Sequence, residues 1–213
     1  MLLSKYPYIV IEGAIGAGKT SLAKKLAEHL DAQTLLEKPQ DNPFLVRFYQ
    51  DSARYALPTQ LFFLFQRINE VRDLAQMKLF GNHTVADYLF EKDALFAQLT
   101  LNEEEHKLYQ SIYQNVALQA PTPDLVIFLQ ASTDTLLERV QRRGHRYEQN
   151  ISVDYLTQLA DLYSHFFHHY DAAPVLMVNS DNLNFLGNPD HFALLLDCIA
   201  KMRGRREFFN VGE

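Results

Sequence analysis

One short segment constrains the fold of this chain more than any other, a glycine-rich loop between an apolar run and an amphipathic run. Residues Gly13–Thr20 match the pattern G-x-x-x-x-G-K-[ST]. The apolar run 8–12 before the loop predicts a buried strand, and the apolar spacing over 23–30 after it predicts a helix. This is the structural context that the pattern requires, so the segment predicts a β–loop–α unit.

The loop has the composition of a phosphate-binding site, although a glycine-rich turn without a ligand is the alternative. Successive backbone N–H groups in such a loop form an anion-binding nest, and the helix N-terminus adds partial positive charge. We expect Lys19 to reach the β- and γ-phosphates of a nucleotide and the Thr20 hydroxyl to ligate Mg²⁺. The residues expected to bind the nucleotide are Gly13, Ala14, Ile15, Gly16, Ala17, Gly18, Lys19, Thr20 and Ser21.

Strand-like and helix-like segments alternate along the rest of the chain. Short β-type runs lie at 34–37, 83–87, 125–129 and 175–178, and the helical patterns include 58–80, 102–119, 133–143, 151–170 and a last helix that closes the chain. Strands separated by such helices predict an α/β fold of three layers, a parallel sheet of about five strands flanked by helices. We expect a P-loop NTPase fold in a single domain over 1–213, with an arginine-rich lid at about 141–150.

Composition limits the classes of function. The chain of 213 residues carries a formal net charge of −6. This argues against nucleic acid as a partner, because proteins that bind nucleic acid use clustered Lys and Arg to neutralise its phosphates. No apolar run reaches the roughly 18 residues of a membrane span, and we expect no signal peptide. The single cysteine, Cys198, has no partner for an internal disulfide. We therefore expect a cytoplasmic protein without a membrane partner.

A phosphate-binding loop does not name the reaction. A GTPase usually carries N-K-x-D after a late strand, whereas residues 179–182 read N-S-D-N, and the chain is short for a motor or transporter subunit. A small-molecule kinase needs an acid that accepts a hydroxyl proton, cations on the transferring phosphoryl group and a lid that excludes water. Glu37 is a candidate for the acid. The arginine-rich run 138–148 is a candidate for the lid, although a solvated helix end has the same composition.

Several motifs, in order along nearly the whole chain, resemble one family. IEGAIGAGKT (11–20), EKPQDNPFLVRFYQD (37–51), ALPTQLFFLFQR (56–67) and RRGHRYEQNISVDYL (142–156) are similar to segments of the deoxyribonucleoside kinases, of the deoxycytidine, deoxyguanosine and deoxyadenosine kinase type. The resemblance implies ATP-dependent phosphorylation of the 5′-hydroxyl of a deoxyribonucleoside in nucleotide salvage. It also implies Mg²⁺ as cofactor and a homodimer.

The resemblance implies roles for individual residues. Glu37 takes the proton of the substrate 5′-hydroxyl, and Tyr49 and Glu148 hydrogen-bond the sugar 3′-hydroxyl. Gln60 pairs with the edge of the base, and the helix that carries it continues to Arg67.

The resemblance also gives an expectation about the base. Family members that accept purines and cytosine have an Arg–Asp pair beside the base, at the positions of Arg67 and Asp93. Thymidine-accepting members tend to have apolar or small residues there. We therefore expect deoxyadenosine, deoxyguanosine or deoxycytidine to be preferred over thymidine.

The chain departs from the family pattern at Asp87-Tyr88-Leu89, where the family usually has an acid followed by arginine and serine. Asp87 can still serve as the magnesium-side carboxylate, with Thr20. Tyr88 lacks the permanent, forked charge of arginine. Lys92, one helical turn further on, is a candidate point charge in its place.

The mechanism expected from these residues is positioning plus neutralisation of charge. The expected catalytic groups are Glu37, Asp87, Lys19, Arg142 and Arg146, with Arg143 on the nucleotide. Two alternatives remain, because the residue after the strand-end acid is tyrosine. One is a nucleotide-binding sensor that transfers little, and the other is a nucleoside monophosphate kinase.

Overall fold

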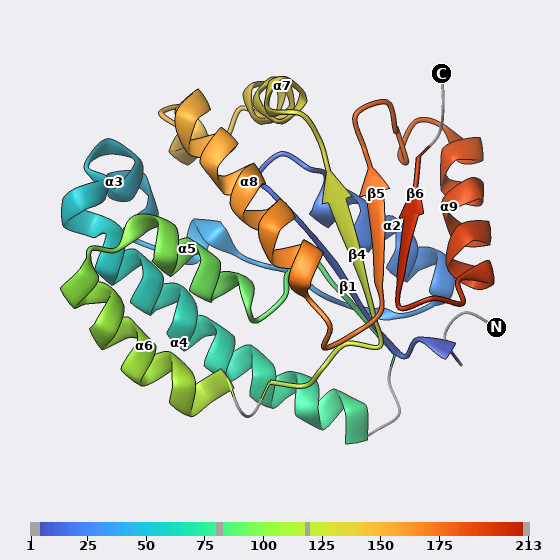
Figure 1. The fold of residues 1–213 in the computed structure, drawn as a ribbon, viewed down its shortest axis with the longest axis horizontal. Coiled ribbons are helices and arrows are strands. Elements are labelled where there is room, and N and C mark those ends of the chain that lie inside the picture. The colour runs from blue at the N-terminus through green and yellow to red at the C-terminus, as the bar shows by residue number, and fades with distance from the viewer. Residues whose placement is uncertain (1–4, 80–82, 118–119, 211–213) are drawn as a thin grey trace.

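The computed structural model describes residues 5–79, 83–117 and 120–210, and these form an α/β fold on one six-stranded sheet (Figure 1). Every adjacent pair of strands is parallel, in the order β2-β3-β1-β4-β5-β6. The strands are β1 (Tyr8–Gly13), β2 (Gln33–Leu35), β3 (Thr84–Ala86), β4 (Leu125–Gln130), β5 (Val175–Asn179) and β6 (Arg206–Phe209).

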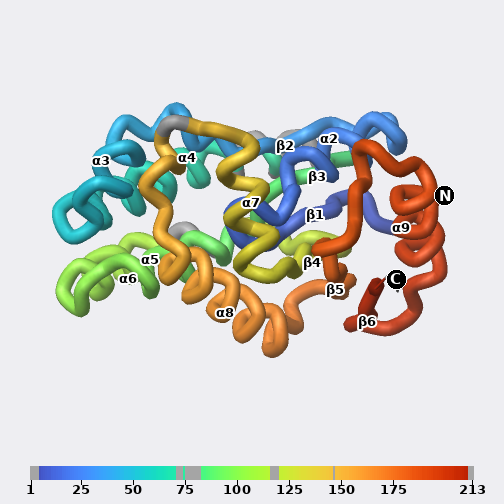
Figure 2. The backbone as a smooth tube through the Cα atoms, turned by 90° about the horizontal axis from the view of Figure 1, so that it is seen from above, coloured from blue at the N-terminus to red at the C-terminus, as the bar shows by residue number. Residues whose placement is uncertain are grey.

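Helices cover both faces of the sheet. Figure 2 shows α2 and α9 on one side of the sheet and α8 on the other. Helices α3, α4, α5 and α6 lie together at the left of that view. The helices are α2 (Lys19–Leu30), α3 (Leu45–Gln50), α4 (Ser52–Leu79), α5 (Lys92–Thr100), α6 (Glu103–Ala117), α7 (Thr133–Arg143), α8 (Val153–His169) and α9 (Pro189–Lys201), with the 3₁₀ turns η1 (Pro39–Asp41) and η2 (Arg146–Glu148).

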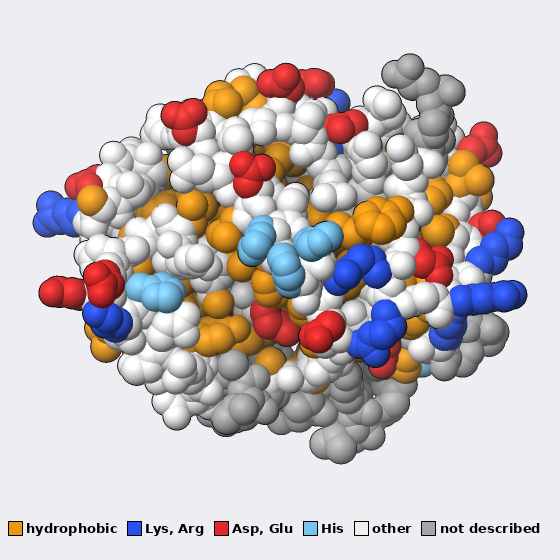
Figure 3. Space-filling view, in the orientation of Figure 1, with side chains coloured by type: hydrophobic (Ala, Val, Ile, Leu, Met, Phe, Trp, Pro, Cys, Tyr) orange, Lys and Arg blue, Asp and Glu red, His pale blue; other side chains and the backbone are white. Residues whose placement is uncertain are grey.

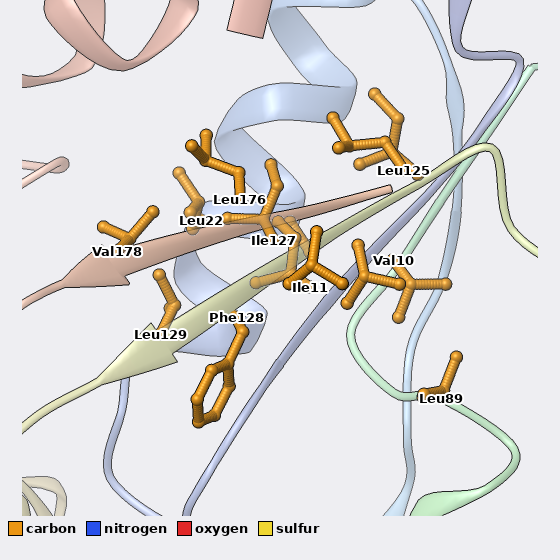
Figure 4. Close-up of a cluster of buried hydrophobic side chains, with 14 of the residues drawn as sticks. Val10, Ile11, Leu22, Leu89, Leu125, Ile127, Phe128, Leu129, Leu176 and Val178 are labelled. Atoms are coloured by element: carbon orange, nitrogen blue, oxygen red, sulfur yellow. The ribbon is translucent and has the colours of Figure 1, made fainter. Parts of the chain in front are cut away.

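The core lies on the central strands, which are apolar over most of their length because a parallel sheet is covered on both faces. Ile11 of β1, Ile127 of β4 and Leu176 of β5 are fully buried, and Leu22 of α2 packs into the same cluster (Figure 4). This layer holds the ends of β1, β2 and β3 in fixed register, and the polar residues that follow those ends form the site described below.

The structure confirms the expected α/β fold with a parallel sheet and corrects two details. The expected last helix does not close the chain, because β6 follows α9 and adds a sixth strand at the edge beside β5. Residues 206–209 alternate between exposed and half-buried, so their apolar signal is weak, as is usual for an edge strand.

The second correction concerns α4. The helix begins at Ser52, six residues before its expected start at Pro58, and the proline lies inside it. Pro58 is the seventh residue of α4, beyond the first turn in which proline is favoured, so it removes one backbone donor inside the helix and does not mark its start. Among the described residues no helix has both the length and the apolar character needed to cross a membrane.

Candidate active site

The glycine loop joins β1 to α2, and two of its glycines are required for different reasons. Gly16 has φ 90°, and a Cβ there would lie 2.6 Å from the carbonyl oxygen of Leu136 in α7, so only glycine lets α7 approach the loop. Gly18 has φ 98° and open space around it, so there the requirement is the left-handed backbone that starts α2. The Lys19 ammonium folds back over the loop and donates to the carbonyl oxygens of Gly13 (2.7 Å) and Ala14 (3.1 Å).

Three chain segments meet at the carboxyl ends of β2 and β3. The Thr20 hydroxyl, at the start of α2, donates to Oδ2 of Asp87. Oδ1 of Asp87, which follows β3, accepts from the backbone N–H of Glu37 at 2.7 Å, and Glu37 follows β2. A hydroxyl and a carboxylate oxygen side by side are the hard ligands that Mg²⁺ prefers, so Thr20 and Asp87 fit the expected metal.

The Glu37 carboxylate is held by two cations. Its Oε1 pairs with the guanidinium of Arg67, and its Oε2 lies 2.7 Å from the Lys92 ammonium. Burial alone raises the pKa of this carboxyl, but Lys92 and Arg67 outweigh burial and hold the pKa well below its usual range. Glu37 is therefore ionised at neutral pH and can accept a proton.

Arg67 lies behind Glu37 and is fully buried among acidic side chains. It pairs with Asp93 (Nε to Oδ1, 3.2 Å) and Glu70 (Nη1 to Oε2, 3.4 Å) as well as with Glu37. Its guanidinium stacks on the ring of Tyr88, 3.8 Å from the ring centroid. Burial lowers the pKa of Arg67, but Asp93 and Glu37 outweigh burial and raise it well above its ordinary value.

One cavity, which we call the inner cavity, brings most of the expected residues together. Loop residues and the acidic residues near the sheet face aromatic side chains from the helices across it. The expected residues that line it are Ile15, Gly16, Lys19, Thr20, Glu37, Tyr49, Gln60, Asp87, Asp93, Arg143 and Glu148, and the aromatic ones are Phe48, Phe63, Phe96, Tyr147 and Tyr155. Arg67 does not line this cavity and instead supports Glu37 and Asp93 from behind.

Gln60 is oriented by a hydrogen-bond chain inside α5. The hydroxyl of Thr100 donates to the carbonyl oxygen of Phe96 at 2.7 Å, so it can only accept from Nε2 of Gln60, which lies 3.2 Å away. The amide oxygen of Gln60 is left for a ligand. Oδ2 of the neighbouring Asp93 is buried and has no hydrogen-bond partner among the described residues. Burial raises the pKa of Asp93, although Arg67 opposes that effect.

The arginines of the expected lid behave differently from one another. Arg143, the last residue of α7, pairs with Glu148 through both carboxylate oxygens, with 3.0 Å from Nε to Oε2. Arg142 is 74% exposed and lies 3.9 Å from Glu138. The side chain of Arg146 lies outside the described part of the structure.

Arg142 contributes to a second cavity, which we call the outer cavity, on the other side of the loop. Gly16, Ala17, Gly18 and Ser21 line one side, while Arg142, Arg143 and Arg139 from α7 and the segment after β5 line the other. Arg139 donates to the carbonyl oxygen of Ser180 at 2.6 Å and so ties α7 to that segment.

Sequence reasoning missed Thr100, Tyr155 and Arg139. Tyr155 lines the inner cavity, and its buried hydroxyl has no partner among the described residues. A repeat of apolar and aromatic residues does not reveal which side chain faces a cavity. For Arg139, the arginine-rich context was visible, but its partner Ser180 lies 41 residues away.

Comparison with known proteins gives a consistent result. A family model described as "Deoxynucleoside kinase" matches residues 9–202. A deoxyguanosine kinase of Bacillus subtilis is 34% identical over 191 residues, which cover 87% of this chain and 92% of the relative. A deoxyadenosine kinase of Lactobacillus acidophilus is 34% identical and covers 84% and 88%. A deoxyadenosine/deoxycytidine kinase of Bacillus subtilis is 27% identical and covers 94% of both chains.

Solved structures agree on the fold. A deoxyadenosine kinase from M. mycoides with bound dCTP has a TM-score of 0.76 and 23% identity, over 91% of this chain and 99% of that one. The same enzyme with the products dCMP and a flexible dCDP has a TM-score of 0.80 at 22% identity, over 91% and 99%. The fold is therefore that of P-loop NTPase-like kinases.

Proposed function

The chain belongs to the deoxynucleoside kinase family and phosphorylates deoxynucleosides, and we propose that the inner cavity holds the deoxyribonucleoside while residues 13–20 hold ATP. One observation carries this assignment. The Glu37 carboxylate lines the same cavity as Lys19 and Thr20 of the glycine loop. A hydroxyl bound at Glu37 is therefore within reach of a phosphate held by the loop.

The proposed reaction is an in-line transfer. The 5′-oxygen forms a bond to the γ-phosphorus of ATP, the bond to the β-bridging oxygen breaks, and the hydroxyl proton passes to the Glu37 carboxylate. The transition state of phosphoryl transfer is loose, so positioning and charge neutralisation supply most of the catalysis. The low pKa of Glu37 fits this role, because it keeps the carboxylate free of a proton before the reaction.

We propose that Thr20 and Asp87 hold Mg²⁺ beside the β- and γ-phosphates. Support comes from their direct contact and from the position of Thr20 directly after Lys19 in the loop. Bound Mg²⁺ would neutralise charge on the phosphates. Asp87 has a further role within this chain, since its other carboxylate oxygen positions the backbone of Glu37.

We propose a purine or cytosine base in preference to thymine. The Arg67–Asp93 pair is formed, and the free Oδ2 of Asp93 can accept from a base amino or imino group. Gln60 offers its amide oxygen from the opposite element, α4. The names of the relatives, deoxyguanosine, deoxyadenosine and deoxyadenosine/deoxycytidine kinase, are in line with this preference.

We propose that Tyr49 and Glu148 bind the sugar 3′-hydroxyl. Both line the inner cavity, and Glu148 is buried. Because Arg143 of the lid holds Glu148, binding of the sugar and placement of the lid are coupled.

The test is steady-state phosphorylation of the four deoxynucleosides with ATP and Mg²⁺, with Glu37→Gln as the control. We expect monophosphate from at least one of deoxyadenosine, deoxyguanosine and deoxycytidine, and a Glu37→Gln rate lower by about 10²–10⁴-fold. Phosphorylation of monophosphates alone would overturn the assignment. ATP binding without transfer to any deoxynucleoside would favour a sensor.

We also propose a homodimer in the cytoplasm. Phe65 of α4 and Leu108 of α6 are 55% and 52% exposed, and these two helices contact each other. A second copy could cover such apolar side chains. The mass of the particle in light scattering tests this, and Phe65→Glu should yield a monomer.

A further inference from the structure

The residue that follows Asp87 does not bring charge to the inner cavity. Tyr88 is 3% exposed, stacks on Arg67, and lines a separate small pocket with Tyr8 and Leu74. A tyrosine in this position carries no permanent charge, and burial raises its pKa further above the ordinary value. Positive charge that acts on reacting groups beside Glu37 must therefore come from a residue other than Tyr88 that faces the inner cavity.

Lys92 is in the right place. Its ammonium is 2.7 Å from Oε2 of Glu37, and the side chain lines the inner cavity together with Lys19 and Thr20. Its Nζ lies 6.0 Å from the ring centroid of Tyr88 and 5.8 Å from that of Phe96. The charge is thus directed to the point where the nucleoside side and the phosphate side of the cavity meet.

The position of Lys92 is unfavourable for the stability of the fold, which indicates a role other than folding. Lys92 is only 5% exposed, and it is the first residue of α5, where the helix dipole disfavours a cation. Replacing a buried ion pair with apolar residues is often neutral or stabilising, so folding alone does not require this pair. Arg67 already pairs with the same carboxylate from within the core. Lys92 faces the cavity, whereas Arg67 does not.

We propose that Lys92 is a catalytic residue of this kinase, which holds the Glu37 carboxylate towards the acceptor hydroxyl and neutralises charge on the transferring phosphoryl group. Lys92 remains protonated throughout, and the proton of the hydroxyl goes to Glu37 as the new oxygen–phosphorus bond forms. The inference rests on the proposed function. A compact ammonium on α5 thus takes the place of a forked guanidinium next to Asp87.

The test compares three substitutions of Lys92 with a matched control. Lys92→Met keeps the apolar stem and removes the charge, Lys92→Gln also keeps a hydrogen-bond donor, and Lys92→Arg restores the charge. Lys107→Met removes an exposed lysine that is also ion-paired, 2.6 Å from Glu103, but that does not line the inner cavity. For each protein, kcat and KM for the best deoxynucleoside and the dissociation constant of ATP are measured.

We expect Lys92→Met and Lys92→Gln to lower kcat by about a hundredfold or more, since removal of a cation from a phosphoryl-transfer site has effects of this size or larger. In these two variants the KM for the deoxynucleoside and the ATP dissociation constant should change only a few-fold. The kcat of Lys92→Arg should be at least tenfold higher than that of the neutral variants. The kcat of Lys107→Met should match that of the wild type. If Lys92→Met does not fold, the Lys92→Gln and Lys92→Arg pair carries the test.

Two results would overturn the role of Lys92 while leaving the kinase assignment intact. One is a neutral variant that keeps the wild-type kcat. The other is Lys92→Arg as inactive as the neutral variants, which would indicate a role in packing rather than in charge. A wild-type protein that phosphorylates no deoxynucleoside would instead overturn the proposed function.

Discussion

The two sides of the glycine loop differ in how their charges are held. In the inner cavity, Arg67, Lys92 and Glu37 are locked together by short contacts, and Arg67 is fully buried. In the outer cavity, Arg142 is 74% exposed and its partner Glu138 is 75% exposed at 3.9 Å. An exposed pair of this kind contributes little to stability. The charges of the inner cavity are organised before any ligand arrives, whereas the outer cavity holds Arg139 in place but leaves Arg142 exposed.

This difference has a physical consequence for specificity. A preorganised polar cavity rejects a wrong base because its buried groups are then left unpaired. Exposed arginines discriminate little between triphosphates, but they can close over the phosphates when these bind. Recognition should therefore depend on the inner cavity and rate on both cavities.

The largest expected effect is at the loop that separates the two cavities. Lys19→Met should lower kcat by about 10³-fold, because the lysine stabilises charge on the phosphates as they react. Rapid-mix assays at saturating substrates measure this. Lys24→Met, an exposed lysine on the same helix α2, is the control and should leave kcat unchanged. Equal losses in both variants would mean that the effect is not specific to the loop.

The comparison predicts that equivalent arginine substitutions differ in stability. Arg67→Met leaves three carboxylates, Glu37, Glu70 and Asp93, without their shared cation, so the free energy of unfolding should fall by about 3–5 kcal/mol. Arg142→Met should change it by less than about 0.5 kcal/mol. Urea denaturation measures both. Similar values for the two variants would refute the contrast between the cavities.

Turnover should still depend on the outer arginines. Arg142→Ala should lower kcat by about tenfold to a hundredfold with little change in the KM for the nucleoside, because the charge acts on the phosphates. Steady-state kinetics at saturating ATP test this. An increase in the nucleoside KM without loss of kcat would show that Arg142 acts on nucleoside binding and not on the phosphates.

A smaller effect concerns the orientation of Gln60. Thr100→Val keeps the shape of the side chain and removes the acceptor that fixes the amide, so it should cost about 1 kcal/mol of base discrimination, roughly fivefold. Competition between deoxynucleosides measures it. Ser111→Ala, at an exposed position of α6, is the control. An unchanged preference for the base would show that Thr100 does not set it.

The smallest expected change is in the pH dependence of stability. The pKa of Glu37 is lower in the folded protein than its ordinary 4.5, so its contribution is complete above about pH 5 and fades as pH falls. The stability difference between wild type and Glu37→Gln should therefore shrink from pH 7 to pH 4. A stability difference that grows towards acid pH would contradict a lowered pKa for Glu37 in the folded protein.

The sequence predicted those parts of the molecule that have strong local patterns. The loop 13–20, the buried strand predicted at 125–129 and the helix predicted at 133–143 all follow from residues close together in the chain. Resemblance to the family supplied the positions of Tyr49, Gln60 and Glu148, which no spacing rule gives, and the structure brings these three into one cavity.

The sequence analysis named Glu37, Arg67 and Lys92 but missed the ion pairs among them, because these pairs join residues that are distant in the chain. Lys92 and Glu37 are 55 positions apart, and Arg67 and Glu37 are 30 apart. Nothing local distinguishes these buried charges from the exposed charges of Lys107 and Arg142. Strand β6 was missed for a different reason, because a half-exposed edge strand with charged residues lacks the apolar run of the central strands.

The most direct test of the central claim is a crystal structure with a deoxynucleoside, Mg²⁺ and a non-hydrolysable ATP analogue. The account predicts the 5′-oxygen within about 3.2 Å of the Glu37 carboxylate, with the γ-phosphate held by the loop and the Lys92 ammonium beside both. A sugar whose 5′-oxygen points away from Glu37 while the analogue occupies the loop would contradict it.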